Sequence, residues 1–294
     1  MGDITQFGFV PKNPVKGVAV CGCTIRCGSV QNGLPEWFDI GLGAVTRLDV
    51  SPDGKLAALV QNSDRISLWD LEQKRLNAKT SVNTIRACLF SPNGDTLWVT
   101  THSGLFAPLN THNLKQHAKT TACKGSDVQS IKCSPNGKYL ATGSCEAETR
   151  KNYLELWDVS KVSTGGIPEK VYAHPTSYTL IHMAFSPDSE TLVVGDLRSA
   201  VAMNAAAGKA TAYLDLGGSV DSLNFTANGT EIMVGMVANH MNFYDLKGKI
   251  TRPRLDLPGM IEAVHPLGHL LCRDNKRFYG VQWFDRQTME AMEF

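Results

Sequence analysis

The chain of 294 residues carries 29 basic and 28 acidic side chains, and its formal net charge of +1 gives it no overall attraction to nucleic acid or to an anionic membrane. Its hydrophobic share of 43% suffices for a sizeable core, and no apolar run approaches the roughly 18 residues of a membrane span. The first residues lack the basic and apolar regions of a signal peptide, and the eight scattered cysteines are typical of a reducing compartment, so we expect a cytoplasmic or nuclear location.

Five short turn motifs recur along the chain. In each, Ser or Thr is followed by Pro or Ala, then by Asp or Asn, and in four of the five by Gly. The motifs begin at Ser51, Ser91, Ser134, Ser186 and Thr226, with successive spacings of 40, 43, 52 and 40 residues. Pro fixes φ and Asp-Gly or Asn-Gly reverses the chain, as in a hairpin connection. A period in the forties, with four short strands in each unit, predicts a β-propeller.

Each clear unit has the same internal order. An alternating strand precedes the turn motif, as at residues 45–50, and a more apolar strand follows it, as at 56–60. A third strand and a more polar outer strand close the unit. The same phase extends to both ends of the chain. We therefore predict an all-β protein in which residues 1–294 form a single seven-bladed β-propeller of four-stranded antiparallel blades. The blades begin near residues 4, 45, 85, 128, 180, 220 and 259, and residues 288–294 could supply the outer strand of the last blade.

The third strand of two units ends in Trp-Asp, and two further units end in a related aromatic-Asp pair. These pairs are Trp69-Asp70, Trp157-Asp158, Tyr244-Asp245 and Phe284-Asp285. In these dipeptides the chain resembles the WD-repeat propeller family, which implies a structural role for the eight residues. The family's Gly-His before the first strand is missing in every unit. In family members that His helps form a buried polar network with the Trp, so we expect apolar packing to hold these blades instead.

The resemblance also implies a non-catalytic scaffold or adaptor that mediates protein–protein interactions as a subunit of a larger assembly. Loops between second and third strands open onto the face that WD-repeat proteins commonly use for partners. The candidate partner-binding residues near these turns are Arg65, Arg150, Arg198, His240 and Lys276. The longest repeat spacing places insertions at residues 145–152 and 160–169; the first is either a contact on that face or a solvated hairpin. A variant of this hypothesis is a reader of a short peptide motif.

An alternative hypothesis is an RNA-associated subunit of a ribonucleoprotein or RNA-processing complex. Its candidate RNA-facing patch consists of Lys115, Lys119, Lys124, Lys132 and Lys138. A second basic cluster near the C-terminus includes Arg252 and Arg254. The neutral charge of the whole chain favours ordinary solvated side chains for both clusters.

Catalytic and metal-binding patterns are weak. Cys21, Cys23 and Cys27 form the one compact cysteine group; Cys21 and Cys23 are expected to share a strand face, but no fourth Cys or nearby His completes a zinc site. The Gly-rich stretches match neither a phosphate loop nor a dinucleotide fingerprint, and no nucleophile elbow is present. We therefore predict no enzymatic activity, no metal, no cofactor and no small-molecule substrate, with a propeller enzyme as the least favoured alternative.

Overall fold

The computed structural model describes residues 4–11, 13–29, 36–41, 43–176, 182–195, 198–257, 259–265, 269–274 and 277–282. Over these residues the strands form six four-stranded sheets and one three-stranded sheet, and the helical content is one 3₁₀ turn, Val162–Thr164. Each strand pairs antiparallel with its neighbour in sequence. The predicted all-β class is confirmed. Within the same residues, no helix has the length and apolar character needed to cross a membrane.

The chain divides into two compact units, one made of Met1–Cys133 and Gly137–Ser177, the other of Ser134–Asn136 and Tyr178–Phe294. The first unit holds β1 (Ile4–Val10), β2 (Asn13–Cys21), β3 (Thr24–Ser29), β4 (Glu36–Asp39), β5 (Val45–Val50), β6 (Leu56–Gln61), β7 (Arg65–Asp70), β8 (Arg75–Ser81), β9 (Ile85–Phe90), β10 (Thr96–Thr101), β11 (Leu105–Asn110), β12 (Thr121–Ala122), β13 (Asp127–Cys133), β14 (Tyr139–Cys145), β15 (Asn152–Asp158) and β16 (Glu169–Thr176). The second unit holds β17 (His182–Phe185), β18 (Thr191–Gly195), β19 (Ser199–Asn204), β20 (Ala210–Asp215), β21 (Val220–Phe225), β22 (Glu231–Met236), β23 (His240–Asp245), β24 (Leu255–Asp256), β25 (Met260–His265), β26 (His269–Asp274) and β27 (Arg277–Gln282).

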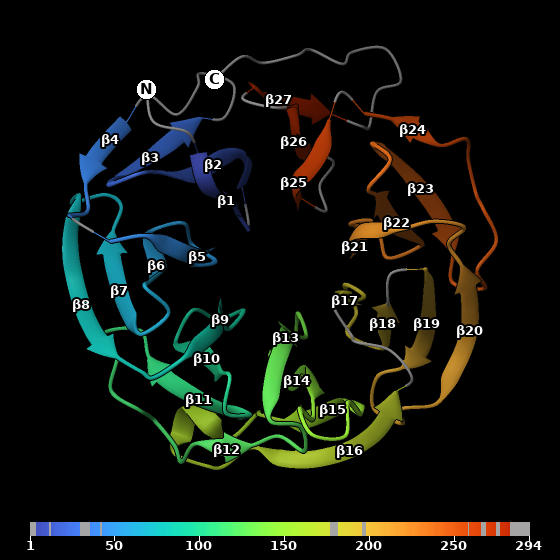
Figure 1. The fold of residues 1–294 in the computed structure, drawn as a ribbon, viewed down its shortest axis with the longest axis horizontal. Coiled ribbons are helices and arrows are strands. Elements are labelled where there is room, and N and C mark those ends of the chain that lie inside the picture. Colours follow the sequence, from blue (N-terminus) through green and yellow to red (C-terminus); the bar gives the residue numbers. More distant parts are fainter. Residues whose placement is uncertain are drawn as a thin grey trace. The chain divides into compact units, whose positions relative to one another are not determined.

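Within each unit the sheets repeat one arrangement (Figure 1). Strands follow one another across each sheet in sequence order, and the first strands of successive sheets contact each other. In the first unit these neighbours are β1, β5, β9 and β13; in the second they are β17, β21 and β25. Among the described residues the last sheet contains three strands, and residues 288–294, considered for its outer strand, lie outside them.

The repeated turn motif forms the same hydrogen-bonded arrangement each time. The Ser or Thr hydroxyl donates to the side-chain oxygen of the Asp or Asn two residues later, at 2.5–2.7 Å in all five motifs. In four motifs it also accepts a backbone N–H from the start of the next strand, as from Leu56 to Ser51 at 2.8 Å. The next position has a positive φ, +73° at Gly54 and +66° at Ser189, which explains the preference for Gly there. The motif thus joins the first and second strands of a sheet.

The last residue of the third strand fixes the turn that follows it. Oδ1 of Asp70 accepts the backbone N–H of Gln73 at 2.8 Å, and Oδ1 of Asp158 accepts that of Ser160 at 3.0 Å. The same kind of bond forms at the corresponding positions of three other sheets, Asn110, Asn204 and Asp245. The Asp of the Trp-Asp dipeptide is therefore a turn-forming residue, and Asn fills that role equally well.

The core consists of apolar layers between neighbouring sheets. The second strands are almost fully buried; all six residues of β10 are, and so are five of the six in β6 and in β22. One layer joins Val18 and Ile25 to Ala57 and Leu59, from the first two sheets. Because a sheet between two others packs one face against each of them, both faces of its middle strands must be apolar.

The partly buried Trp69 and the buried Trp157 also take part in polar contacts. Trp69 Nε1 donates to Ser67 Oγ at 3.0 Å, and Trp157 Nε1 donates to Thr142 Oγ1 at 3.1 Å. Cys123, which lies before the first strand of its sheet, places its Sγ 3.6 Å from the same Thr142 oxygen. The expectation that apolar packing replaces the family's polar network is therefore wrong for these two sheets. For these two indole N–H groups, hydroxyl side chains supply the acceptor in the absence of the His.

Candidate functional site

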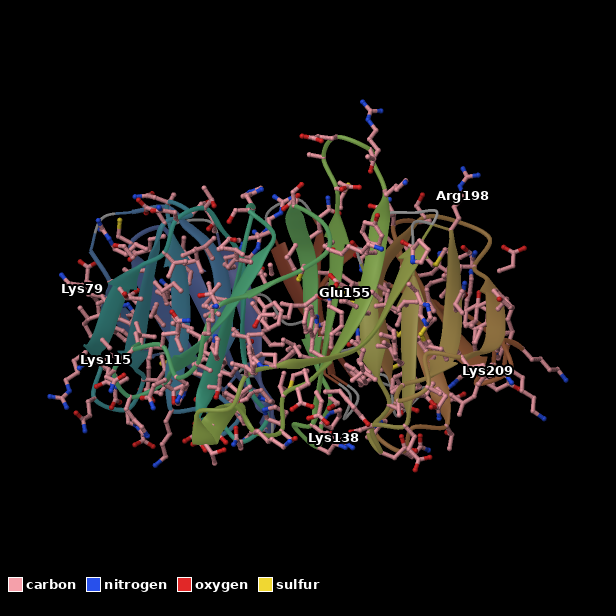
Figure 2. All side chains as sticks on the ribbon, turned by 90° about the horizontal axis from the view of Figure 1, so that it is seen from below. Lys79, Lys115, Lys138, Glu155, Arg198 and Lys209 are labelled. Atoms are coloured by element: carbon pink, nitrogen blue, oxygen red, sulfur yellow. The ribbon has the colours of Figure 1, made fainter. Side chains whose placement is uncertain are left out.

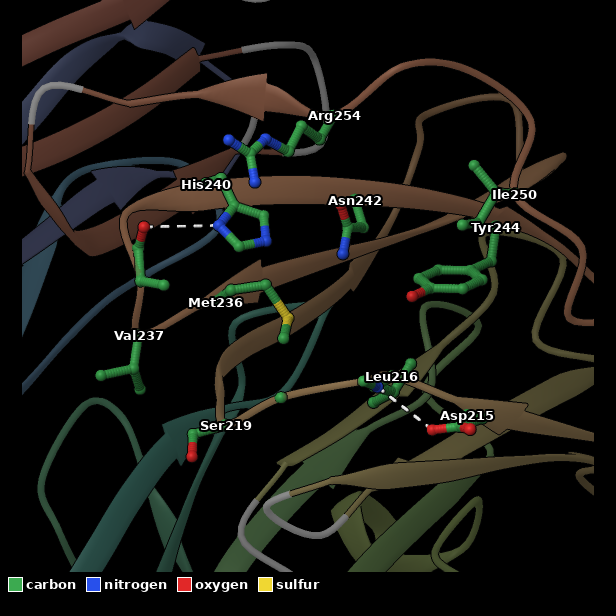
Figure 3. Close-up of a pocket in the computed structure, with 13 residues that line it drawn as sticks. Asp215, Leu216, Ser219, Met236, Val237, His240, Asn242, Tyr244, Ile250 and Arg254 are labelled. Atoms are coloured by element: carbon green, nitrogen blue, oxygen red, sulfur yellow. Dashed lines mark hydrogen bonds between the residues drawn. The ribbon is translucent and has the colours of Figure 1, made fainter.

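A pocket of about 710 Å³ lies in the second unit, next to β23 (Figure 3). Its walls come from the β20–β21 connection, the β22–β23 turn, β23 itself and the segment that leads to β24. The lining residues are Asp215, Leu216, Gly217, Gly218, Ser219, Met236, Val237, Ala238, His240, Asn242, Tyr244, Ile250 and Arg254. We refer to it as the β23 pocket.

Strand alternation produces one wall of the β23 pocket. Met241 and Phe243 are almost fully buried in the core between β23 and the next sheet. His240, Asn242 and Tyr244 alternate with them and therefore face the other way, into the pocket. Since successive side chains of a strand point to opposite faces, the residues that build this wall are determined by the apolar residues between them.

The opposite wall depends on a close backbone approach. The β20–β21 connection turns at Gly217, whose φ is +66° and whose N–H donates to Asp215 Oδ1 at 3.1 Å. A Cβ on Gly218 would lie 3.0 Å from Met236 Cε. Two adjacent glycines therefore bring this wall close to the Met236 side chain at the floor of the pocket.

The charges of the pocket are separated. Arg254 precedes β24, and continuing the register of His240 with Asp256 places Arg254 opposite Asn242 on β23. Arg254 and His240 thus supply cationic or hydrogen-donating groups near one end. The Asp215 carboxylate lies across the pocket, on the side of Tyr244 (Figure 3). Burial raises the pKa of Tyr244, a hydrogen bond from the Asn242 side chain opposes this, and the Asp215 charge adds to the rise. One pocket therefore presents opposite charges at its two ends.

Four large apolar side chains of the second unit are exposed. The exposed fractions are 77% for Tyr213 on β20, 59% for Ile250 and 47% for Val237. Leu246 in the loop before Ile250 adds a fourth, at 38%. Two of these four, Ile250 and Val237, line the β23 pocket, and exposed apolar side chains at a pocket are the kind of surface that marks an interaction site.

Four of the five candidate partner-binding residues lie at described turns between second and third strands. Arg65 is the first residue of β7, Arg198 precedes β19, and His240 is the first residue of β23. Arg150 lies in the loop before β15, with a φ of +54°, and Figure 2 shows that loop projecting from its sheet. Lys276 lies outside the described residues. Of these five residues, His240 lines the β23 pocket, and the backbone of Arg198 accepts the N–H of the pocket residue Leu216 at 3.1 Å. A partner-binding role for the set stays a prediction.

The candidate RNA-facing lysines have different surroundings. The ammonium of Lys124 lies over the Tyr153 ring, 4.6 Å from its centre, and that of Lys138 lies over the Tyr139 ring at 4.9 Å. Lys132 lies on the first strand β13, whereas Lys115 and Lys119 lie in the connection before β12 (Figure 2 marks Lys115 and Lys138). They belong to several strands and turns of the first unit, and RNA binding by them stays a prediction.

Charged side chains on first strands connect neighbouring sheets of the first unit. Arg47 Nε on β5 donates to the Arg86 carbonyl on β9 at 3.1 Å. Arg86 also forms an ion pair with Asp127 on β13 at 3.4 Å. Asp49 on β5 accepts the Phe90 N–H at 2.6 Å. These groups join three consecutive sheets to one another.

Asp49 and Lys132, whose charges act on each other, have displaced pKa values. Burial raises the pKa of Asp49 to about 6, against the opposing effects of the Phe90 N–H and of Lys132. Burial likewise lowers the pKa of Lys132, and the Asp49 carboxylate opposes that change. Displaced values also occur in active sites, but the Asp49 carboxylate here holds a backbone group of the next sheet.

The cysteine group differs from the sequence expectation. Cys21 ends β2, Gly22 follows with a φ of +60°, and Cys23 lies in the turn, so the two thiols do not share a strand face. Cys21 and Cys27 are buried and Cys23 is exposed. Burial raises the pKa of both Cys21 and Cys27, which disfavours the thiolate that a metal requires. Over the described part of the chain, no three Cys, His, Asp or Glu side chains gather as ligands for a metal ion.

The comparison with known families concerns the sheet that holds Trp157. Residues 111–158 match the family model described as WD domain, G-beta repeat. This stretch is similar to a WD repeat. It runs from the end of β11 through β15 and closes on the Trp157-Asp158 dipeptide, which confirms the resemblance to the WD-repeat family without identifying a particular member. WD-repeat proteins are in general protein-interaction scaffolds, and they are typically non-catalytic.

The aromatic residues of the dipeptides pack against neighbouring side chains where they are described. Trp69 packs against Phe38, with ring centres 5.8 Å apart, and Trp157 packs against Phe106 at 5.0 Å. Tyr244 is buried in the core and also lines the β23 pocket. Phe284 and Asp285 lie outside the described residues.

Proposed function

We propose that this chain is a non-catalytic WD-repeat scaffold or adaptor that binds other proteins as a subunit of a larger assembly. The observation that carries the proposal is that Ile250 and Val237, two exposed apolar side chains, line the β23 pocket of a chain that resembles the WD-repeat family. Covering exposed apolar side chains with a partner removes their surface from water, which favours binding by about 25 cal/mol for each Å² of apolar surface buried. A stable partner would cover well over about 1,000 Å² in total.

The proposal includes a single seven-bladed propeller formed by residues 1–294, with its site of action in the cytoplasm or nucleus. Seven sheets support it, since their first strands begin at residues 4, 45, 85, 127, 182, 220 and 260. Six of the seven sheets have four strands, and the last has three among the described residues. The longest interval between starts is the one that contains the β14–β15 loop and the 3₁₀ turn.

Affinity purification of the tagged full chain from its native cell, in mild salt, tests the scaffold function. A stoichiometric set of proteins that stays with the chain through gel filtration is the expected result. Elution of the chain alone, at its own mass, would contradict a constitutive subunit.

The RNA hypothesis is separated by repeating the purification over a salt series. Five lysine–phosphate contacts would weaken RNA binding on the order of 10²–10³-fold between about 50 and 200 mM salt. Apolar docking changes little over that range. Nucleic acid that elutes as salt rises, together with all co-purifying proteins, would favour the RNA-associated alternative.

A further inference from the structure

The β23 pocket has the dimensions of a site for part of a peptide. Its volume of about 710 Å³ is within the range of roughly 300–1,000 Å³ found for ligand sites. The wall from His240 to Tyr244 covers four residue steps of a strand, about 13 Å. An extended peptide of four or five residues has the same length.

The floor of the pocket suits a large apolar side chain. Leu216 and Met236 belong to the core layer between the two sheets, and their pocket-facing atoms form the bottom (Figure 3). Met is flexible and polarisable, so it adapts to side chains of different shape. Ile250 and Val237 stand at the rim, 59% and 47% exposed, where they would be covered by the entering residue.

One end of the pocket suits a carboxylate. The Nε of Arg254 forms an ion pair with Asp256 at 3.0 Å, but both side chains are more than half exposed, so this pair contributes little. Within the described part of the chain, the terminal guanidinium nitrogens of Arg254 make no hydrogen bond, and they can bind a carboxylate in bidentate fashion. The Nδ1 of His240 lies 3.3 Å from the Ala238 carbonyl, which holds the ring at the same end.

The other end suits a cation. Asp215 is exposed, and its Oδ1 accepts the N–H of Gly217 at 3.1 Å. That bond orients the carboxylate and leaves its second oxygen for a partner. Arg254 and Asp215 line the same pocket from different walls, so they define a direction along it.

From this charge pattern we propose that the β23 pocket binds an extended peptide segment of a partner protein, with an acidic residue against Arg254 and His240, a large apolar residue over Met236, and a basic residue towards Asp215. This proposal deepens the scaffold function and rests on it. The partner would be recognised by a peptide segment in which an acidic, an apolar and a basic residue follow one another in that order.

The test selects peptides on the purified full-length chain from a phage library of random 12-residue sequences, with the Arg254→Glu variant as the counter-selection. We expect enriched sequences to share an acidic residue and a large apolar residue within four or five positions. Synthetic fluorescent versions are then titrated by anisotropy. Arg254→Glu should weaken their binding at least tenfold, and exchanging the acidic residue of the peptide for Lys should restore binding to that variant.

Lys209→Glu provides the matched control, since it makes the same change of sign in the second unit. Figure 2 shows Lys209 at the opposite edge of its sheet from Arg198, whose backbone contacts the pocket residue Leu216. We expect Lys209→Glu to change the affinity for the peptides less than twofold. Unchanged thermal unfolding of both variants shows that they are folded.

Three outcomes would overturn the proposal: no enrichment over the counter-selection, equal binding of the peptides to wild type and Arg254→Glu, or a pocket filled by a second copy of the chain, seen as a dimer that Arg254→Glu dissociates. Purification from cells with the Arg254→Glu variant separates this result from the scaffold function. If the same cellular proteins accompany the variant as accompany wild type, the scaffold function stands and the assignment of the pocket is wrong. If no protein accompanies either chain, the scaffold function itself fails.

Discussion

Asp49 on β5 is a partly buried acidic residue that contacts the neighbouring sheet. Its carboxylate is largely enclosed, yet it holds the Phe90 N–H of the neighbouring sheet at 2.6 Å. Because burial raises the pKa of Asp49 to about 6, the folded chain takes up a proton at a pH where the unfolded chain stays ionised. A link between two sheets is therefore coupled to pH.

We predict that Asp49→Asn stabilises the protein more at pH 7 than at pH 4. In wild type the free energy of unfolding should fall as pH rises from about 4 to about 6, since the native state alone binds the proton there. Asn keeps an acceptor for the Phe90 N–H and carries no charge. The free energy of unfolding of the variant, relative to wild type, should therefore rise by about 1–3 kcal/mol over this pH range, at about 1.4 kcal/mol for each pKa unit. Urea unfolding at both pH values measures it.

Asp53→Asn is the control with the opposite sign. Partial burial alone would raise the pKa of Asp53, but hydrogen bonds from Ser51 and from the Lys55 N–H hold it below its ordinary value. Its stabilising effect is present at neutral pH and is lost as pH falls. Asp53→Asn should therefore lower the free energy of unfolding, relative to wild type, more at pH 7 than at pH 3. If this difference from wild type followed the same pH dependence in Asp49→Asn and Asp53→Asn, the account would be contradicted.

Residue types alone could predict much of the turn chemistry and little of the pocket. The Ser-Pro-Asp-Gly motif carries its own donors, acceptors and backbone preference within a few residues, so its place between two strands is readable from sequence. The pocket brings together Asp215, His240 and Arg254, which lie up to 39 residues apart, and only the packing of two sheets does so. His240 can be selected from its turn position, whereas Arg254 is one of several basic residues near the C-terminus. Tyr213 and Ile250 carry no local pattern that marks them as exposed.

At the scale of strands and sheets, the period of the motifs predicts the order and the middle strands well, because a strand buried on both faces must be apolar. The outer strands are less regular. β12 and β24 contain two residues each, whereas β16 contains eight. Outer strands have one exposed face and one neighbour, so composition constrains their length weakly.

The β15–β16 pair contains a buried charge that the sequence does not reveal. Glu155 is fully buried, its Oε2 accepts the Lys124 N–H at 2.7 Å, and its Oε1 lies 2.6 Å from Lys170 Nζ. The Lys170 ammonium also lies over the Trp157 ring, 4.6 Å from its centre. This pair therefore joins the outer strand to the WD-repeat Trp.

We predict that Lys170→Met lowers the free energy of unfolding by about 1–3 kcal/mol, because it leaves a buried carboxylate without its cation. Adding Glu155→Gln should recover most of this loss, since the amide carries no charge. Guanidinium unfolding midpoints measure both. Lys161→Met is the control: its partner Glu169 is 3.5 Å away and both side chains are about two-thirds exposed, so the change should stay below about 1 kcal/mol. Equal losses for the two Lys variants would show that burial of Glu155 has no energetic consequence.

At the scale of the whole molecule, the proposal of a single propeller predicts a definite size. If residues 1–294 form a single compact body, its radius of gyration should be about 19 Å. Small-angle X-ray scattering on the monomer measures this directly. A clearly larger value with a two-lobed distance distribution would mean that the two compact units are separate bodies and that the single-domain prediction is wrong.

The turn motif has a consequence for chemical ageing. Three of the five motifs contain Asn followed by Gly, at Asn93, Asn136 and Asn228, and Asn is among the residues most prone to thermal damage. Hydrolysis of such a side chain to Asp changes little here, since Asp already fills the same position at Asp53 and Asp188, where it accepts the hydroxyl in the same way. The lesion that matters is isoaspartate, which inserts a backbone atom and moves that acceptor away from the hydroxyl. Stored protein should therefore tolerate simple deamidation and lose order where isoaspartate forms.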